Sequence, residues 1–335
     1  MSSVSDRRRW FEEIKSAVLS GNSSKAAEYL YYAYSEVFLS VTSQYRLGTN
    51  VYEREWDALI VLDSCRVDAM QEVAPEYDFI DTVDSIWSVG STSPEWYVKT
   101  FVPEYADQIA ETAFISANPN AEATLVKDDY PPRHPTPFDA AGWDTVSAED
   151  LAYLEMTRKH DRPYDDVSDV APSSTAVEVP SYVTDRTIVA GRDGYEKLMI
   201  HYFQPHRPFM HDFIEHGDEM SYVEDKPYEA GRKGMTSKEK LWPLYLDNLR
   251  LVLDSIEVLL ENLDAERVAI TADHGELLGE LDQWGHFQSI PHPQLKRVPW
   301  VETTATDKET RHPDEEFAIA HDDSVQEQLA DLGYL

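Results

Sequence analysis

Short apolar runs recur along the chain at intervals typical of strands that alternate with helices. The apolar stretch ALIVL within residues 57–63 has no polar interruption, as expected for a central parallel strand buried on both faces. Four further runs have the composition of strands, and they occupy residues 111–120, 196–206, 266–274 and 297–303. This alternation predicts an α/β fold with a mostly parallel central sheet flanked by helices. The Pro- and Asp-rich segments 127–146 and 160–180 predict loops over one face of the sheet.

Two segments have helical patterns of different kinds. In 237–263, Leu, Val and Ile recur at three- and four-residue spacing, which predicts a long amphipathic helix with Pro243 in its first turn. Residues 6–47 combine aromatic and aliphatic positions and predict helices that pack against the main domain. We therefore divide the chain into an N-terminal helical appendage, 1–50, and a main domain, 51–335, although no linker-like composition marks the boundary.

The charge of the chain sets it apart from an ordinary globular protein. It has 335 residues, of which 42% are hydrophobic, so it can bury a sizeable core. It also has 63 acidic against 29 basic residues, for a net charge of -34. Acids spread along the whole chain argue against binding to nucleic acid or to an anionic membrane surface. Such an acidic surface is typical of halophilic proteins from a highly saline cytoplasm; a merely acidic protein of ordinary salinity is the alternative.

Cysteine use and the N-terminus bear on where the protein works. Cys65 is the sole cysteine, so no internal disulfide requires an oxidising compartment. The arginine run at 7–9 resembles the start of a twin-arginine export signal, but charged residues interrupt the apolar stretch that should follow. No segment has the roughly 18 consecutive apolar residues of a membrane span. The sequence predicts a soluble, cytoplasmic protein without an integral membrane segment.

Carboxylates and imidazoles stand at or just after the ends of several predicted strands. Ligands of open α/β sheets bind at the carboxyl ends of the strands, so these side chains should meet at one edge. A single acid in such a place, Asp63 for example, is often only a helix N-cap. A set of them favours a metal site, and oxygen and nitrogen ligands without thiolates suit Zn²⁺ or Mn²⁺ better than Ca²⁺ or Mg²⁺. The residues concerned are Asp63, His201, His206, Asp273, His274 and His286.

Several motifs resemble the sulfatase-like branch of the alkaline phosphatase superfamily, and the charge suggests a haloarchaeal type. TADHGELLGE followed by WGH resembles its metal-binding signature, and ALIVLDSCRVDAM resembles its first strand. HYFQPHRPF is similar to its strand with a Pro-His-x-Pro segment. RVPWVE and the ending VQEQLADLGYL resemble its late strand and terminal helix. The likeness spans about residues 55–335 in the expected order, so 51–335 is expected to be a sulfatase-like catalytic domain.

The resemblance implies roles for individual residues. Asp63, Asp273 and His274 match metal ligands. His206 matches a histidine that contacts the charged group of the substrate, and His286 matches one that holds a second metal or the substrate. Arg66 is placed to neutralise substrate charge, although an ion pair with Asp68 explains it equally well.

The family also requires a nucleophile, which sulfatases form from the cysteine of a Cys-x-Pro-x-Arg motif. This chain has SVGSTSPEWY at 88–97 and no cysteine there. Alignment on Pro94 makes Thr92 the nucleophile and a metal ligand, with Ser91 and Ser93 as alternatives one position away. The segment is also a plausible helix start, with Ser93 as the N-cap and Pro94 in the first helical position.

A hydroxyl nucleophile changes the expected chemistry. Formylglycine suits sulfate transfer, whereas Thr or Ser activated by a metal suits attack on phosphorus. The resemblance therefore implies a metal-dependent hydrolase or transferase that acts on a phosphate ester or diester, either small or linked to a glycan or lipid. Two alternatives remain open: a sulfatase that lacks formylglycine, and a sulfatase-like fold that has lost catalysis and serves as a binding protein.

Overall fold

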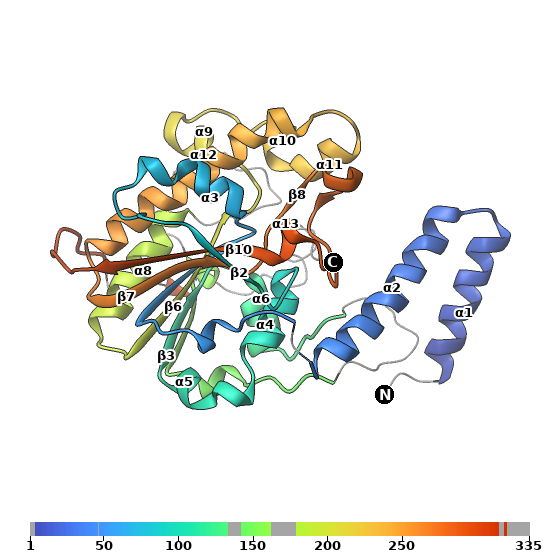
Figure 1. Cartoon of the computed structure of the whole chain (residues 1–335), viewed down its shortest axis with the longest axis horizontal. Coiled ribbons are helices and arrows are strands. Elements are labelled where there is room, and N and C mark those ends of the chain that lie inside the picture. The colour runs from blue at the N-terminus through green and yellow to red at the C-terminus, as the bar shows by residue number, and fades with distance from the viewer. Residues whose placement is uncertain (1–3, 46, 133–141, 162–178, 315–317, 320–335) are drawn as a thin grey trace.

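The structure is a computed structural model that describes residues 4–45, 47–132, 142–161, 179–314 and 318–319. Its centre is a seven-stranded sheet in the order β2-β10-β7-β1-β6-β3-β4 (Figure 1). The strands are β1 (Ala58–Asp63), β2 (Asp84–Trp87), β3 (Thr112–Ser116), β4 (Tyr153–Met156), β6 (Lys197–Pro205), β7 (Ala265–Ala272) and β10 (Arg297–Ala305). Neighbouring strands from β7 to β4 pair in parallel, whereas β10 is antiparallel to both β7 and β2. The predicted fold class is confirmed.

The strand β1 lies at the middle of this sheet, and all six of its residues are buried. Its continuous apolar run follows from helices on both faces of the sheet. Contacts place α3 (Val67–Val73), α8 (Pro180–Arg192) and α12 (Lys238–Leu260) together on one face. The helices α4 (Ser93–Thr100) and α6 (Pro119–Leu125) lie side by side on the other (Figure 1). The shorter helices are α5 (Ala106–Ala110), α9 (His211–His216), α10 (Tyr222–Asp225), α11 (Pro227–Arg232) and α13 (Pro293–Lys296).

The long helix α12 differs from the prediction at its start. It begins at Lys238, so Pro243 is its sixth residue and lies in the second turn, not in the first. Proline there removes the backbone hydrogen bond to the residue four positions earlier. The helix is nevertheless held by packing, because Leu241 and Tyr245 are both fully buried on either side of the proline.

An N-terminal helical hairpin extends from the body of the molecule (Figure 1). It consists of α1 (Val4–Leu19) and α2 (Ser23–Thr42), as the pattern over 6–47 predicts. Tyr31 and Tyr34 donate hydrogen bonds from α2 to the carbonyls of Gln288 and Ser289 in the body. The hairpin thus contacts the main domain in a loop that follows His286. Division of the chain at residue 50 stays our prediction.

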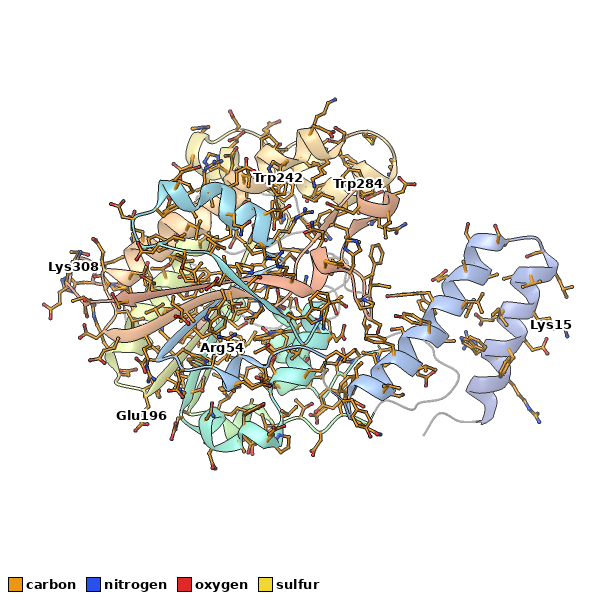
Figure 2. All side chains as sticks on the ribbon, viewed as in Figure 1. Lys15, Arg54, Glu196, Trp242, Trp284 and Lys308 are labelled. Carbon is orange, nitrogen blue, oxygen red and sulfur yellow. The ribbon has the colours of Figure 1, made fainter. Side chains whose placement is uncertain are left out.

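The sequence pattern missed two strands of the central sheet, β2 and β4. Each has four residues, too few for a clear alternation, and β2 is exposed at Asp84 and Trp87. The predicted loops 127–146 and 160–180 lie partly outside the described residues. The predicted terminal helix at 325–335 lies wholly outside them. Charged side chains such as Lys15, Glu196 and Lys308 lie at the periphery (Figure 2). Within the described ranges, no helix combines the length and the apolar character needed to cross a bilayer.

Candidate metal and nucleophile site

Three neighbouring strands deliver two carboxylates and an imidazole to one point. Asp63 ends β1, Asp273 directly follows β7, and His201 lies within β6 opposite Val61 of β1. Because β6 and β7 both run parallel to β1, their carboxyl ends meet at the same edge of the sheet. One ligand atom from each of these three side chains lies within 4.8 Å of the others, and all three residues are fully buried.

His274 places another possible ligand atom beside the two carboxylates of this group. Its Nε2 lies 3.5 Å from Asp273 Oδ2 and 3.8 Å from Asp63 Oδ1. Its Nδ1 lies 2.8 Å from the carbonyl oxygen of Gly275, so Nδ1 carries the proton and donates it to that carbonyl. A backbone partner on one ring nitrogen is how proteins aim the lone pair of the other nitrogen at a metal.

The donor set fits a divalent cation. The carboxylates are held by neutral groups, since Asn118 Nδ2 donates to Asp63 at 2.7 Å and the Ser64 amide donates to Asp273 at 3.1 Å. Two buried carboxylates so close together repel each other unless a cation compensates their charge. His201 points to the same conclusion, because its buried Nε2 has no hydrogen-bond partner among the described residues and lies 3.6 Å from Asp273 Oδ2.

The state of His201 also suits a ligand. Burial lowers the pKa of His201 to about 4, so the ring is neutral at neutral pH. Its Nδ1 lies 2.6 Å from the hydroxyl of Tyr97, a partner that can fix the tautomer and leave the Nε2 lone pair available. Oxygen and nitrogen donors in this ratio suit Zn²⁺ or Mn²⁺.

The hydroxyl beside these ligands belongs to Ser93. Its Oγ donates to Asp273 Oδ2 at 2.6 Å, lies 3.3 Å from His274 Nε2, and accepts from Asn118 Nδ2 at 3.1 Å. Ser93 is the first residue of α4, and Pro94 is the second. The interpretation of Ser93 as the N-cap is therefore wrong by one position, because Thr92 occupies the N-cap with φ -150° and ψ 158°.

The other two hydroxyls of the segment have different surroundings. Thr92 Oγ1 is buried, makes no capping hydrogen bond, and has no hydrogen-bond partner within the described ranges. Ser91 Oγ lies 2.8 Å from Glu95 Oε2 and 3.0 Å from the carbonyl oxygen of Phe287. The geometry therefore favours Ser93, which the sequence left as an alternative, over Thr92, which the sequence preferred.

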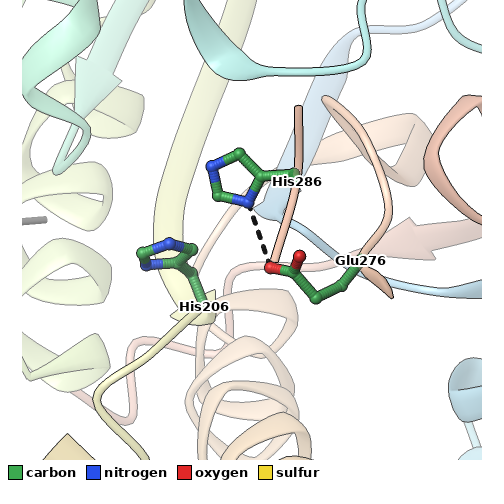
Figure 3. Close-up of side chains that lie close together, drawn as sticks. All are labelled: His206, Glu276 and His286. Atoms are coloured by element: carbon green, nitrogen blue, oxygen red, sulfur yellow. Dashed lines mark hydrogen bonds and ion pairs between the residues drawn. The ribbon is translucent and has the colours of Figure 1, made fainter. Parts of the chain in front are cut away.

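A second group of possible ligands adjoins the first. His206, Glu276 and His286 each place a ligand atom within 4.8 Å of the others. Figure 3 shows the two imidazoles and the carboxylate facing one another, with His286 Nδ1 3.1 Å from Glu276 Oε2. Burial and the neighbouring His286 hold the pKa of His206 well below its usual value, so its ring is neutral. The ring of His286 lies 4.4 Å from that of His274, which joins the two groups.

Arg66 makes ion pairs with two acids outside both groups of possible ligands. Its buried guanidinium donates to Asp68 at 2.6 Å and to Glu280 at 2.9 Å, so the ion pair with Asp68 that the sequence left open is present. It also donates to the carbonyl oxygen of Glu276 at 3.1 Å. These contacts make Arg66 a support for the loop that carries Glu276.

Sequence reasoning gave Asn118 no role at the site. Asn118 follows β3 and is fully buried, and its amide group contacts both Asp63 and Ser93. The available signal is its place near the end of the run predicted as a strand, 111–120, which is the same signal that identifies Asp63 and Asp273. Asn118 also caps α6 by accepting a hydrogen bond from the Asn120 amide.

No protein-family model and no curated protein matches the sequence. Solved structures do match. The soluble domain of lipooligosaccharide phosphoethanolamine transferase A from Neisseria meningitidis is 15% identical, with a TM-score of 0.44 over 74% of this chain and 75% of that one. The C-terminal periplasmic domain of EcEptC from Escherichia coli, a complex with Zn, is 14% identical, with a TM-score of 0.44 over 85% and 83%.

Phosphonate monoester hydrolase of Agrobacterium radiobacter is 13% identical, with a TM-score of 0.40 over 73% of this chain and 67% of that one. These neighbours belong to the sulfatase-like branch of the alkaline phosphatase superfamily, the family that the motifs resemble. Similarity this low carries no argument about the site, whose interpretation rests on its own residues.

Proposed function

We propose that the chain is a metal-dependent hydrolase or transferase of the sulfatase-like type that acts on a phosphate ester or diester through Ser93. The observation that carries the proposal is the position of Ser93 Oγ, 2.6 Å from Asp273 Oδ2 and 3.3 Å from His274 Nε2 at the start of a helix. A hydroxyl within reach of metal ligands and of free helical N–H groups is the arrangement that phosphoryl transfer to a side chain needs.

Asp63, Asp273, His274 and His201 would hold the cation, which we propose to be Zn²⁺ or Mn²⁺. When bound, such a cation supplies positive charge that lowers the pKa of a nearby hydroxyl and offsets the charge of a phosphoryl group. His206, Glu276 and His286 are the second set that could take a cation or contact the charged group of the substrate. Among the residues proposed from the sequence, only Thr92 and Arg66 lose a direct part in this scheme.

The side chains divide the chemistry between them. Ser93 Oγ loses its proton to solvent and forms the bond to phosphorus while the bond to the leaving oxygen breaks, and the leaving oxygen takes up a proton from solvent. A monoester leaves a phosphoserine, and a diester leaves a phosphoserine that keeps the second ester substituent. Water or an alcohol then takes the phosphoryl group from Ser93, and the choice between them decides whether the enzyme is a hydrolase or a transferase. Asn118 already donates to Ser93 Oγ, so its amide is placed to donate to a phosphoryl oxygen as well.

The residues give no comparable support to sulfate chemistry. Cys65, the one cysteine, is fully buried, and burial raises the pKa of its thiol. It lies in DSCRVD and lacks the Pro and Arg of the motif that is converted to formylglycine. A sulfatase that works without formylglycine and a binding protein without catalysis are the outcomes against which the proposal is tested.

The test is an assay of purified protein with added Zn²⁺ or Mn²⁺ on p-nitrophenyl phosphate, its phenyl diester and p-nitrophenyl sulfate. We expect turnover of a phosphate substrate, and we expect Ser93→Ala to lower kcat by roughly 10³-fold or more, because covalent catalysis loses its first step. Thr92→Ala and Ser91→Ala serve as matched controls one residue away and should cost far less.

Each other result has a distinct meaning. Turnover of the sulfate alone would establish the sulfatase alternative. Failure on all three substrates by metal-loaded protein would favour the binding protein. Loss of activity in Thr92→Ala with an active Ser93→Ala would return the nucleophile to Thr92.

A further inference from the structure

A buried acid, Glu95, lies two residues beyond the proposed nucleophile. Its side chain is fully buried, and its Oε2 accepts three hydrogen bonds. They come from the Ser91 amide at 3.1 Å, the Ser91 hydroxyl at 2.8 Å and the Ser289 amide at 3.2 Å. The other oxygen, Oε1, accepts from the ammonium group of Lys99, which is also buried.

These contacts join two segments that carry separate parts of the site. Ser91 precedes Ser93 by two residues, and Ser289 follows His286 by three. The Ser91 hydroxyl strengthens the same junction, because it accepts from the Ile290 amide at 3.3 Å. Farther out, Ser289 Oγ lies 2.9 Å from Ser35 Oγ of α2, and Lys99 donates to Thr42 at 2.8 Å. The junction therefore also ties the N-terminal hairpin to the site.

The network requires a carboxylate. Burial alone raises the pKa of Glu95, but the charges of Lys99 and Lys296 outweigh it and lower the pKa to about 2. An ionised carboxylate offers acceptor oxygens on both sides, one for Lys99 and one for the two backbone amides. Each of those donors is buried, so the loss of an acceptor leaves a polar group without compensation.

We propose that Glu95 is a positioning residue that holds the Ser93 segment and the His286 segment at a fixed separation. It acts through Ser91 and Ser289 and does not contact the reacting atoms. The expected effect of Glu95 on turnover rests on the proposed function, whereas its effect on the relative position of the two segments does not depend on that function. A small displacement of a reacting group lowers the reaction rate by a large factor. We therefore expect that loosening this junction lowers kcat.

A glutamine at residue 95 would have only one acceptor oxygen, whereas the network uses both carboxylate oxygens of Glu95. In Glu95→Gln the amide oxygen should face Lys99, because an unpaired buried ammonium costs more than unpaired amides. The amide nitrogen then meets the Ser91 and Ser289 N–H groups, donor against donor. In Glu95→Gln/Lys99→Met, the oxygen is free to accept from Ser91 and Ser289 again. The double variant should therefore regain what the single variant loses.

The experiment compares wild type, Glu95→Gln, Glu95→Gln/Lys99→Met and a control, Glu155→Gln. The control breaks another buried ion pair, that of Glu155 on the edge strand β4 with Arg186. We expect Glu95→Gln to lower kcat about 10- to 100-fold with KM and metal content close to wild type. The double variant should recover most of that loss. Glu155→Gln should lower the melting temperature with little change in kcat.

Amide hydrogen exchange gives a readout that needs no activity. Peptides covering 88–97 and 284–292 should exchange faster in Glu95→Gln than in wild type or Glu155→Gln, and should slow again in the double variant. Unchanged exchange and unchanged kcat in Glu95→Gln would overturn the proposal, as would a double variant no better than the single one. If wild type turns over no ester, the proposed function fails, and the exchange result alone decides whether Glu95 positions the segments.

Discussion

At the scale of single residues, the site depends on which way adjacent side chains of one segment point. Ser93 Oγ faces Asp273, His274 and Asn118, whereas Thr92 Oγ1, one residue earlier, is buried without a hydrogen-bond partner in the described structure. Thr92 has extended backbone angles and Ser93 begins the helix, so their side chains leave the chain in different directions. The hydroxyl that we propose as the nucleophile is thus set by where α4 begins.

The sequence pattern predicts most residues of the candidate site, but it does not decide which hydroxyl of Ser91, Thr92 and Ser93 faces the proposed ligands. Asp63, Asp273 and His274 were predictable because each ends or follows an apolar run, and parallel strands bring such ends together. A helix start is less definite in sequence, since Ser, Thr and Pro are all compatible with neighbouring positions at an N-terminus. His201 was ambiguous because it lies inside β6, where a strand pattern predicts a buried side chain without saying what faces it.

The proposed ligands make a residue-scale prediction. Asp273→Asn and His274→Ala should each weaken Zn²⁺ or Mn²⁺ binding by at least about tenfold, because even outer-shell partners of metal ligands contribute that much. His201→Ala should also weaken binding if its free Nε2 is a ligand. Calorimetric titration and elemental analysis measure affinity and content. His216→Ala, an exposed imidazole of α9, is the control and should bind as wild type does. Full metal occupancy and affinity in Asp273→Asn and His274→Ala would show that TADHGE is only a structural turn.

At the scale of elements, the loop that follows β7 is held in place by close packing of its backbone against the backbone of α13. The Gly275 amide donates to the carbonyl oxygen of Leu295 at 2.8 Å. A Cβ on residue 275 would collide with the carbonyl oxygen of Gln294. Glycine therefore allows the loop after β7 to pack directly against α13, and this packing places Asp273 and His274.

Gly275→Ala tests that packing. The added methyl group should force the loop from α13, lower the free energy of unfolding by about 1–3 kcal/mol and weaken metal binding, because His274 moves with its neighbour. Denaturant unfolding and metal titration give the two values. Gly142→Ala adds the same methyl group where no atom of the described residues lies within 4 Å, and it should leave both values unchanged. If Gly275→Ala bound metal as tightly as wild type, the close approach would have no part in placing the ligands.

Long helices and strands were predictable from the sequence because their hydrophobic patterns extend over many residues, whereas the shortest strands were not. The run of β1 and the spacing within α12 specify buried surfaces clearly, and both elements are present. The four-residue strands β2 and β4 join the edges of the sheet through pairing with β10 and β3, which no local pattern reveals. The start of α12 was misplaced because tertiary packing of Leu241 and Tyr245 tolerates Pro243 inside the helix.

At the scale of the whole molecule, repulsion among the excess negative charges destabilises the folded state. A net charge of -34 on 335 residues produces self-repulsion that salt screens over a Debye length of about 10 Å at 0.1 M and about 3 Å at 1 M. We therefore expect the melting temperature to rise markedly between about 0.1 M and molar KCl, with unfolding or loss of solubility at the low end. Thermal scans in KCl and in sucrose of equal osmolality separate screening from solute exclusion. A melting temperature that does not change with KCl would contradict the halophilic interpretation.

The central claim is that Ser93 accepts the phosphoryl group, and the most direct measurement is mass spectrometry of a reaction quenched during turnover of a slow phosphate diester. The peptide that contains GSTSPEW should gain one phosphoryl group that still carries the second ester substituent of the diester, and fragmentation should place this group on Ser93. The same peptide from Ser93→Ala should stay unmodified. Phosphate on Thr92 or Ser91, or none on this peptide while the enzyme turns over, would contradict the account.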